Sequence, residues 1–140
     1  MKFARIIRNI LVAKQFTLGK HERLKSRKSI EQLFSEGKKI AVAPYRVNYM
    51  FHLSAGTPAL LFGAAVSAKN FKKAVDRNRV KRLVREAWRL QKNYLKESVN
   101  AKNVQLHVFI IYTGKELPAF DDTHKKVGAI LKKLQKLVDA

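Results

Sequence analysis

The residues of this chain best suited to chemistry lie in the segment Lys69–Trp88, KNFKKAVDRNRVKRLVREAW. At ~100° per residue, a helix here would carry polar and cationic residues on one face: Asn78, Lys81, Arg82, Arg85, Arg89 and Lys92. Its other face would carry Val80, Leu83, Val84, Ala87 and Trp88. Crowded cations repel one another unless an anion lies against them, and the arginines can bind phosphate oxygens in pairs. The segment therefore predicts a surface that binds a nucleic-acid backbone.

Other chemistries have little support. The four histidines (His21, His52, His107, His124) are scattered, with no metal-ligand spacing among them. Asp121 and Asp122 are adjacent, but a helix-capping role suits them better than an acid–base pair. There is no cysteine and no glycine-rich phosphate loop. We therefore predict no catalytic and no metal-binding side chains in the chain itself.

Composition favours a single basic domain. The chain has 140 residues, a net charge of +20 and a hydrophobic fraction of 46%, enough for a core. Such a charge balance indicates a nucleic-acid partner and no membrane, and no apolar run is long enough to span a bilayer. We expect residues 1–15 to be a poorly ordered extension, with a basic amphipathic surface helix as the alternative. Residues 16–140 would form one RNA-binding domain.

The apolar pattern predicts the elements that position these residues. Residues 26–36 read as a helix capped by Ser26 or Ser29 and ended by Gly37. Strands are expected at Lys39–Val42, Tyr45–Leu53, Ala59–Ser67 and Leu106–Tyr112, the second and third as an antiparallel hairpin. Helices are expected over Phe71–Glu97 and from Asp121 or Asp122 to Val138. This order, α-β-β-β-α-β-α, predicts an α+β two-layer sandwich.

Aromatic side chains suggest a second mode of binding. Single-stranded nucleic acid stacks its bases on aromatic faces beside a basic groove. Tyr45, Val47, Tyr49 and Phe51 share one face of a strand, so some of them belong to the core. Phe34 and Tyr45 are the candidates for the groove.

The order Arg77-Asn78-Arg79 followed by Val80–Trp88 resembles the signature of the bacterial ribonuclease P protein component. The preceding stretch Gly63–Lys69 resembles the strand that leads into that motif. Upstream, Arg23-Leu24-Lys25 followed by Ile30, Phe34 and Gly37 resembles the family's N-terminal pattern, although the family often has an aromatic residue where Ile30 stands. The likeness covers roughly residues 16–137. It implies a ribosomal-protein-like fold with a left-handed crossover at the basic helix, an exception to the usual right-handed rule.

The resemblance also implies a function. The family's protein joins a catalytic RNA, and together they remove the 5′ leader of precursor tRNA by cutting one phosphodiester. In this family the RNA performs the cleavage with the help of magnesium ions, which are bound mainly by the RNA. The resemblance also implies that the protein is cytoplasmic. The residues expected to contact RNA are then Lys69, Arg77, Asn78, Arg79, Lys81, Arg82, Arg85 and Arg89. The leader cleft would be lined by Arg23, Lys25, Phe34 and Tyr45.

Two other functions remain open at this stage. The first is a ribosomal-type or general RNA-binding protein without a processing role, which the positive net charge alone does not distinguish from the ribonuclease P protein. A nuclease acting without RNA, using a metal held by carboxylates such as Asp121 and Asp122, is the third reading.

Overall fold

The computed structural model describes residues 18–53 and 56–140. The extension expected at residues 1–15 lies outside these ranges. Along the chain the elements are η1 (Lys20–Glu22), α2 (Arg27–Glu36), β1 (Lys38–Val42), β2 (Tyr45–Leu53), β3 (Ala59–Val66), α3 (Ala74–Gln91), α4 (Asn93–Lys102), β4 (Val104–Tyr112) and α5 (Phe120–Asp139). The α+β class and the predicted element order are confirmed. No helix among the described residues is both long and apolar enough to cross a membrane.

Helix α2 begins and ends where the sequence predicted. The Ser26 side chain accepts a hydrogen bond from the Ser29 N–H at 3.3 Å, which caps the first turn. At the other end the Gly37 N–H donates to the Leu33 carbonyl at 2.9 Å. A Cβ on Gly37 would lie 2.3 Å from that same oxygen, so only glycine allows this tight exit into β1.

The four strands pair in the order β1-β2-β4-β3. β1 and β4 run antiparallel to β2 on its two sides, whereas β3 runs parallel to β4. The expected hairpin between Tyr45–Leu53 and Ala59–Ser67 is therefore wrong, because β4 lies between the two strands. β4 is the most continuously buried strand, and a central position covers both of its faces. The left-handed sense of the crossover from β3 to β4 stays a prediction.

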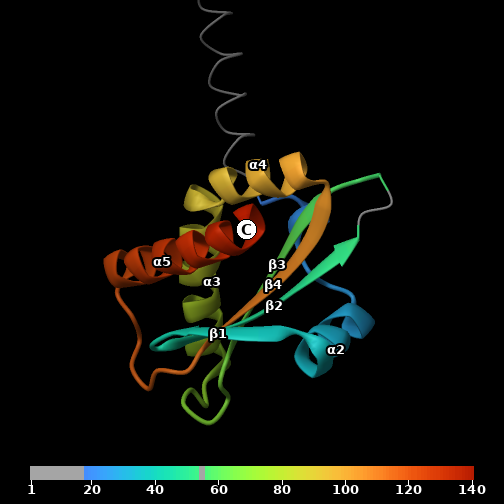
Figure 1. Ribbon diagram of the computed structural model, residues 1–140. Coiled ribbons are helices and arrows are strands. Elements are labelled where there is room, and N and C mark those ends of the chain that lie inside the picture. Colours follow the sequence, from blue (N-terminus) through green and yellow to red (C-terminus); the bar gives the residue numbers. More distant parts are fainter. Residues whose placement is uncertain (1–17, 54–55) are drawn as a thin grey trace, which may run out of the picture.

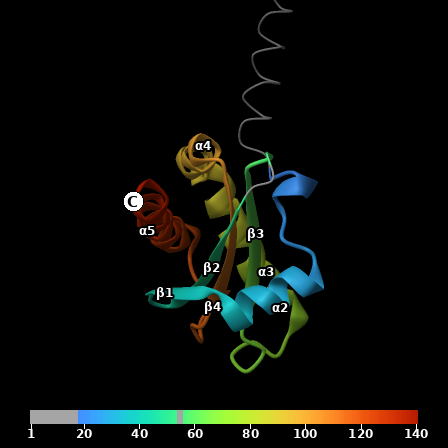
Figure 2. The same ribbon diagram turned by 45° about the vertical axis from the view of Figure 1, so that its right-hand side comes forward.

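Helices α3, α4 and α5 cover one face of the sheet, and α2 lies on the other face (Figures 1 and 2). The main core forms on the three-helix side. There the Trp88 ring stacks on Phe62 with centroids 4.4 Å apart and planes within 9°. Burial of each large side chain of this kind stabilises the fold by roughly 1.5–3 kcal/mol. The side with α2 holds a smaller cluster around Leu24, Leu33 and Phe109, a layer that the two-layer prediction did not include.

The long basic helix expected over Phe71–Glu97 is divided at Lys92 into α3 and α4. The Lys92 backbone stays near helical angles (φ −72°, ψ −17°), so the chain changes direction without a loop. The break lets α4 place Leu95 and Val99 in the core beside α5. After α4, Asn103 adopts a left-handed conformation (φ 53°) and ends the helix.

Helix α5 begins two or three residues earlier than predicted. Its N-cap is Ala119, which forms no side-chain capping bond, so neither Asp121 nor Asp122 caps the helix. Both aspartates lie exposed in the first turn instead. Negative charge there is stabilised by the helix dipole, which explains the residue types without catalysis.

Candidate nucleic-acid interface

One face of α3 presents arginines at spacings of three and four residues. Arg82, Arg85 and Arg89 line a hollow of about 360 Å³ together with Leu18, Arg23 and Glu86. Side chains at these spacings lie above one another on a helix. The structure therefore brings together three of the predicted RNA-binding arginines and Arg23, which was predicted for the leader cleft.

Arg23 reaches the hollow because its backbone runs along the free edge of β3. It forms an isolated parallel bridge with Phe62, and the next residue, Leu24, donates its N–H to the Phe62 carbonyl at 2.8 Å. Leu24 is buried in the smaller core, which fixes the exposed side chains on either side of it, Arg23 and Lys25. The sheet edge thus positions one wall of the hollow and α3 the other.

Glu86 partly neutralises this basic surface. Arg89 Nε donates to a Glu86 carboxylate oxygen at 3.1 Å, and Arg89 Nη2 contacts the other oxygen. The hydrogen bond from Arg89 lowers the pKa of Glu86, and the carboxylate raises the pKa of Arg89. In the part of the chain that the structure describes, Arg82 and Arg85 form no ion pair with a carboxylate. The charge of these two arginines is therefore not neutralised by any described carboxylate.

The start of α3 holds the Arg-Asn-Arg motif. Arg77 Nη1 donates to the carbonyls of Phe71 and Lys72 at 2.7 and 2.8 Å, which secures the turn before a helix that lacks a side-chain cap. Asn78 and Arg79 are exposed beside it. Lys69, also exposed, lies in the connection between β3 and α3. Arg77 thus has a structural role in addition to the RNA contact predicted for it.

Two further cations of the expected basic face differ from the arginines. Lys81 is half-buried on α3. Lys92 was expected on the outer face with them, which is wrong: it is 1% exposed and its Nζ pairs with the Glu22 carboxylate. The turn between α3 and α4 directs this side chain inward, beneath η1.

Glu22 is a positioning residue that the sequence analysis missed. Its carboxylate accepts hydrogen bonds from Lys92, from Lys96 Nζ at 2.6 Å and from the Gly19 N–H at 3.0 Å. Burial alone would raise the pKa of Glu22, but the hydrogen bonds from the two lysines and Gly19 outweigh it and lower the pKa. A lone carboxylate in the basic stretch Lys20–Lys25 was the available signal.

A second candidate surface lies on the sheet face beside α2. Phe34 is 39% exposed and meets Phe109 edge-on, with centroids 5.2 Å apart and an interplanar angle of 66°. A Cβ on Gly63 would lie 2.6 Å from the Phe109 ring, so this glycine makes room for the ring across β3. Phe109 was not predicted, and it supports the exposed aromatic face of Phe34 from beneath.

Tyr45 does not belong to this surface, so its assignment to the leader cleft is corrected. It is 1% exposed on the opposite face of the sheet, where its hydroxyl donates to Thr123 Oγ1 at 3.2 Å. Burial raises the pKa of this hydroxyl. The alternation along β2 puts Tyr45, Val47 and Tyr49 in the main core, whereas Asn48, Met50 and His52 face the side of α2.

Two histidines meet on that same side. The rings of His52 and His107 lie 4.4 Å apart on neighbouring strands, and His107 is 8% exposed. Burial, and then the charge of His52, lowers the pKa of His107 to about 4, so the ring is neutral at physiological pH. His107 Nε2 has no hydrogen-bond partner among the described residues. A structural role was predicted for both histidines, and the burial of His107 agrees with it.

Within residues 18–53 and 56–140, no three His, Asp or Glu side chains lie close enough together to hold a metal ion. Three of the described carboxylates form ion pairs with cations instead: Glu22 with Lys92 and Lys96, Glu31 with Arg27, and Glu86 with Arg89.

Comparisons with known proteins agree on one family. The family model described as ribonuclease P matches residues 18–135. A ribonuclease P protein component of Porphyromonas gingivalis is 41% identical over 108 residues, which are 75% of this chain and 77% of the relative. One from Chlorobium phaeobacteroides is 31% identical over 125 residues, covering 82% of this chain and 86% of the relative.

A solved structure supports the fold. The RNase P protein of Staphylococcus aureus superimposes with a TM-score of 0.56 at 22% identity. The match covers 84% of this chain and 95% of that one.

Proposed function

Because the chain belongs to the ribonuclease P protein component family, we propose that it is the protein subunit of a ribonuclease P holoenzyme. In this role it assists a catalytic RNA that cuts precursor tRNA endonucleolytically and releases the 5′ leader. The protein binds both the RNA subunit and the leader. We also propose that it acts in the cytoplasm.

The observation that carries this proposal is the hollow lined by Arg23, Arg82, Arg85 and Arg89. It is concave and mainly cationic, and its arginines come from α3 and from the segment that bridges the edge of β3, so the backbone brings these charges together before a partner arrives. Arginine offers paired donors that match phosphate oxygens. We assign the hollow and the adjacent motif residues Asn78 and Arg79 to the phosphate backbone of the RNA subunit.

The leader is assigned to the other surface. Phe34 offers an aromatic face for a base, and Arg23 and Lys25 are exposed in the segment that leads into α2. Single-stranded RNA is bound by such a combination of stacking and charge. Arg23 would then lie between the RNA subunit and the leader, because it faces the hollow and precedes α2.

The chemistry itself is assigned to the RNA. The described side chains offer no cluster suited to a metal ion, so we propose that magnesium is held mainly by RNA phosphates. The protein's contribution is electrostatic and positional. It screens the repulsion between two polyanions and thereby favours the magnesium-bound geometry of the RNA.

The test is a cleavage assay at a magnesium concentration too low for the catalytic RNA alone. Added protein is expected to restore cleavage of precursor tRNA at its mature 5′ end. Protein free of RNA is expected to leave the substrate intact. Binding to structured RNA without any rescue would contradict the proposal and favour a general RNA-binding protein.

A further inference from the structure

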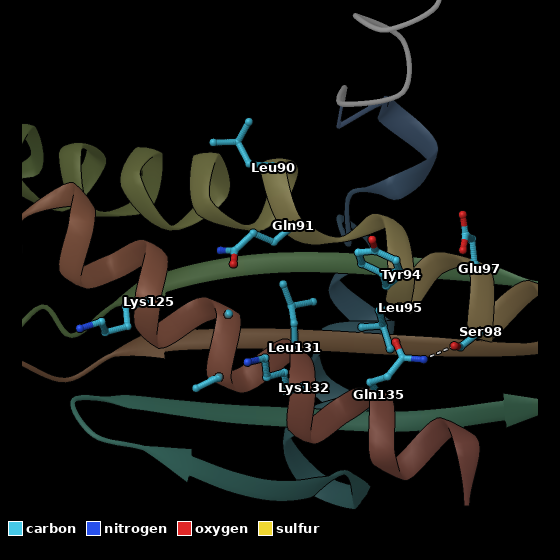
Figure 3. A pocket seen from close by; sticks show the side chains of 12 residues that line it. Leu90, Gln91, Tyr94, Leu95, Glu97, Ser98, Lys125, Leu131, Lys132 and Gln135 are labelled. Carbon is cyan, nitrogen blue, oxygen red and sulfur yellow. Dashed lines mark hydrogen bonds between the residues drawn. The ribbon is translucent and has the colours of Figure 1, made fainter.

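A groove of about 930 Å³ lies between the end of α3 with α4 on one side and α5 on the other (Figure 3). Its walls and floor are mainly apolar, and the side chains that matter here are Leu90, Tyr94, Leu95, Leu131, Lys125 and Lys132. None of the RNA-binding or leader residues discussed above lines it. The proposed function therefore leaves this groove unused.

Hydrogen bonds between the helices hold the groove in shape. Gln91 Nε2 donates to the Ala87 carbonyl at 3.1 Å and to the His124 carbonyl on α5 at 2.9 Å. Farther along, Gln135 on α5 contacts the Ser98 hydroxyl on α4, as Figure 3 shows. Leu95 and Leu131 are buried between these two ties. The groove is therefore a preformed feature of the packed helices.

The wall on α4 exposes an aromatic ring. Tyr94 is 80% exposed, and Leu90, one turn before it on α3, is 36% exposed. Both line the groove. A rigid aromatic side chain left in water beside an apolar channel is available to stack on a flat apolar ligand.

The wall on α5 is cationic. Lys125 and Lys132 are seven residues apart, so they lie on the same side of α5 about two turns from each other. Neither forms an ion pair within the described ranges 18–53 and 56–140. Glu97 is the single carboxylate among the lining residues. The groove thus combines an exposed ring with two uncompensated cations on the facing helix.

We infer that this groove is a second RNA-binding site, which takes a single-stranded segment with a base stacked on Tyr94 and phosphates beside Lys125 and Lys132. Base stacking on an aromatic ring next to cations is how single strands are bound without sequence preference. The site is separate from the arginine hollow. Leu90 directly follows Arg89 and so points about 100° away around the helix axis.

Charge decides between the occupants of such a groove. A second copy of the chain would bring its own net charge of +20 against two lysines, and like charges repel. RNA brings negative charge together with flat apolar bases, which matches both walls. An acidic peptide with an apolar anchor is the alternative that the experiment must distinguish.

The experiment is an NMR titration of the full-length ¹⁵N-labelled protein with a ten-nucleotide oligouridylate at low salt. We expect saturable amide shifts in residues 91–98 and 125–135, in addition to any shifts around Arg82 and Arg85. Tyr94→Ala should weaken the groove affinity roughly fivefold or more, and Tyr94→Phe should retain it. Lys125→Gln with Lys132→Gln should also weaken it.

Lys126→Gln with Lys133→Gln is the matched control. These lysines follow the groove lysines by one residue, so they lie about 100° around α5 and do not line the groove. The control removes the same charge and should leave the groove shifts intact. Circular dichroism of every variant checks that the fold is retained.

Several results would overturn the inference. The inference fails if the oligouridylate shifts only amides around the arginine hollow, or if only an acidic peptide shifts the amides of the groove. It also fails if the protein forms a concentration-dependent dimer that Tyr94→Ala abolishes. The assay needs no catalytic RNA. Failure of the groove to bind and failure of the low-magnesium cleavage assay are therefore separate outcomes.

Discussion

Lys92, at the break between α3 and α4, donates its buried ammonium to the carboxylate of Glu22, which directly precedes Arg23. This pair fastens the segment along the edge of β3 to the basic helix. It joins residues seventy positions apart, and Lys96 adds a second contact to the same carboxylate at 2.6 Å. One wall of the arginine hollow therefore depends on an ion pair outside the hollow.

Glu22→Ala is expected to destabilise the protein by about 3 kcal/mol, because it leaves the Lys92 ammonium buried without its carboxylate. Urea unfolding at neutral pH measures the change. Glu31→Ala is the control, since the Arg27–Glu31 pair is exposed (93% and 70%) and should be worth less than about 1 kcal/mol. Equal effects of the two substitutions would contradict the positioning role of Glu22.

The same pair predicts a pH dependence. Because the folded-state pKa of Glu22 is lowered, its contribution is present above the unfolded-state value of 4.5 and is lost as the pH falls through the lower folded-state value. The stability difference between the wild type and Glu22→Ala should therefore be constant above about pH 5.5 and shrink in acid. A difference that grows toward low pH would show that the carboxylate does not stabilise the fold.

His107 predicts a second pH effect in a different range. Its pKa is about 4 in the folded protein, whereas an unfolded histidine titrates near 6.5. The unfolded chain binds more protons between these values, so stability should fall by up to about 3 kcal/mol from pH 6.5 to pH 4. Urea unfolding of the wild type and of His107→Leu at both pH values tests this. The variant should lose less free energy of unfolding than the wild type between pH 6.5 and pH 4. An NMR titration that places His107 near 6.5 would contradict it.

Local patterns predicted the elements well, because each depends on residues close together in the chain. Ser26 and Gly37 mark the ends of α2, and the alternation along β2 separates Tyr45 and Val47 from Asn48. Strand order could not be predicted this way. β4 carries an unbroken apolar run, which gives no sign of its neighbours or of which face bears Phe109.

The candidate site, too, could be predicted only where it depends on residues close together in the chain. The spacing of Arg82, Arg85 and Arg89 was enough to place them on one face of a helix. The break at Lys92, the role of Glu22 and the support of Phe34 by Phe109 all depend on contacts between distant segments. Helical periodicity treats every cation of the stripe alike, and so it could not separate buried Lys92 from exposed Arg85.

Arg82→Ala and Arg85→Ala should each weaken binding to the catalytic RNA and lower its salt dependence by about one unit of slope, because each removes one phosphate contact. Binding measured over a series of salt concentrations gives the slope. Lys115→Ala, which removes an exposed cation between β4 and α5, should leave it unchanged. If both arginine variants keep the wild-type slope, these residues lie outside the interface.

Substitutions at Phe34 and Tyr45 should have different effects, the first on leader binding and the second on stability. Phe34→Ala removes a partly exposed ring, so it should weaken holoenzyme binding of leader-carrying precursor tRNA about tenfold and leave leaderless tRNA unaffected. Tyr45→Phe removes a buried hydrogen bond to Thr123, so it should cost about 1 kcal/mol of stability without changing leader preference. The measurements are tRNA binding with and without a leader, and urea unfolding of both variants. A loss of leader preference in Tyr45→Phe but not in Phe34→Ala would move the leader to the other face of the sheet.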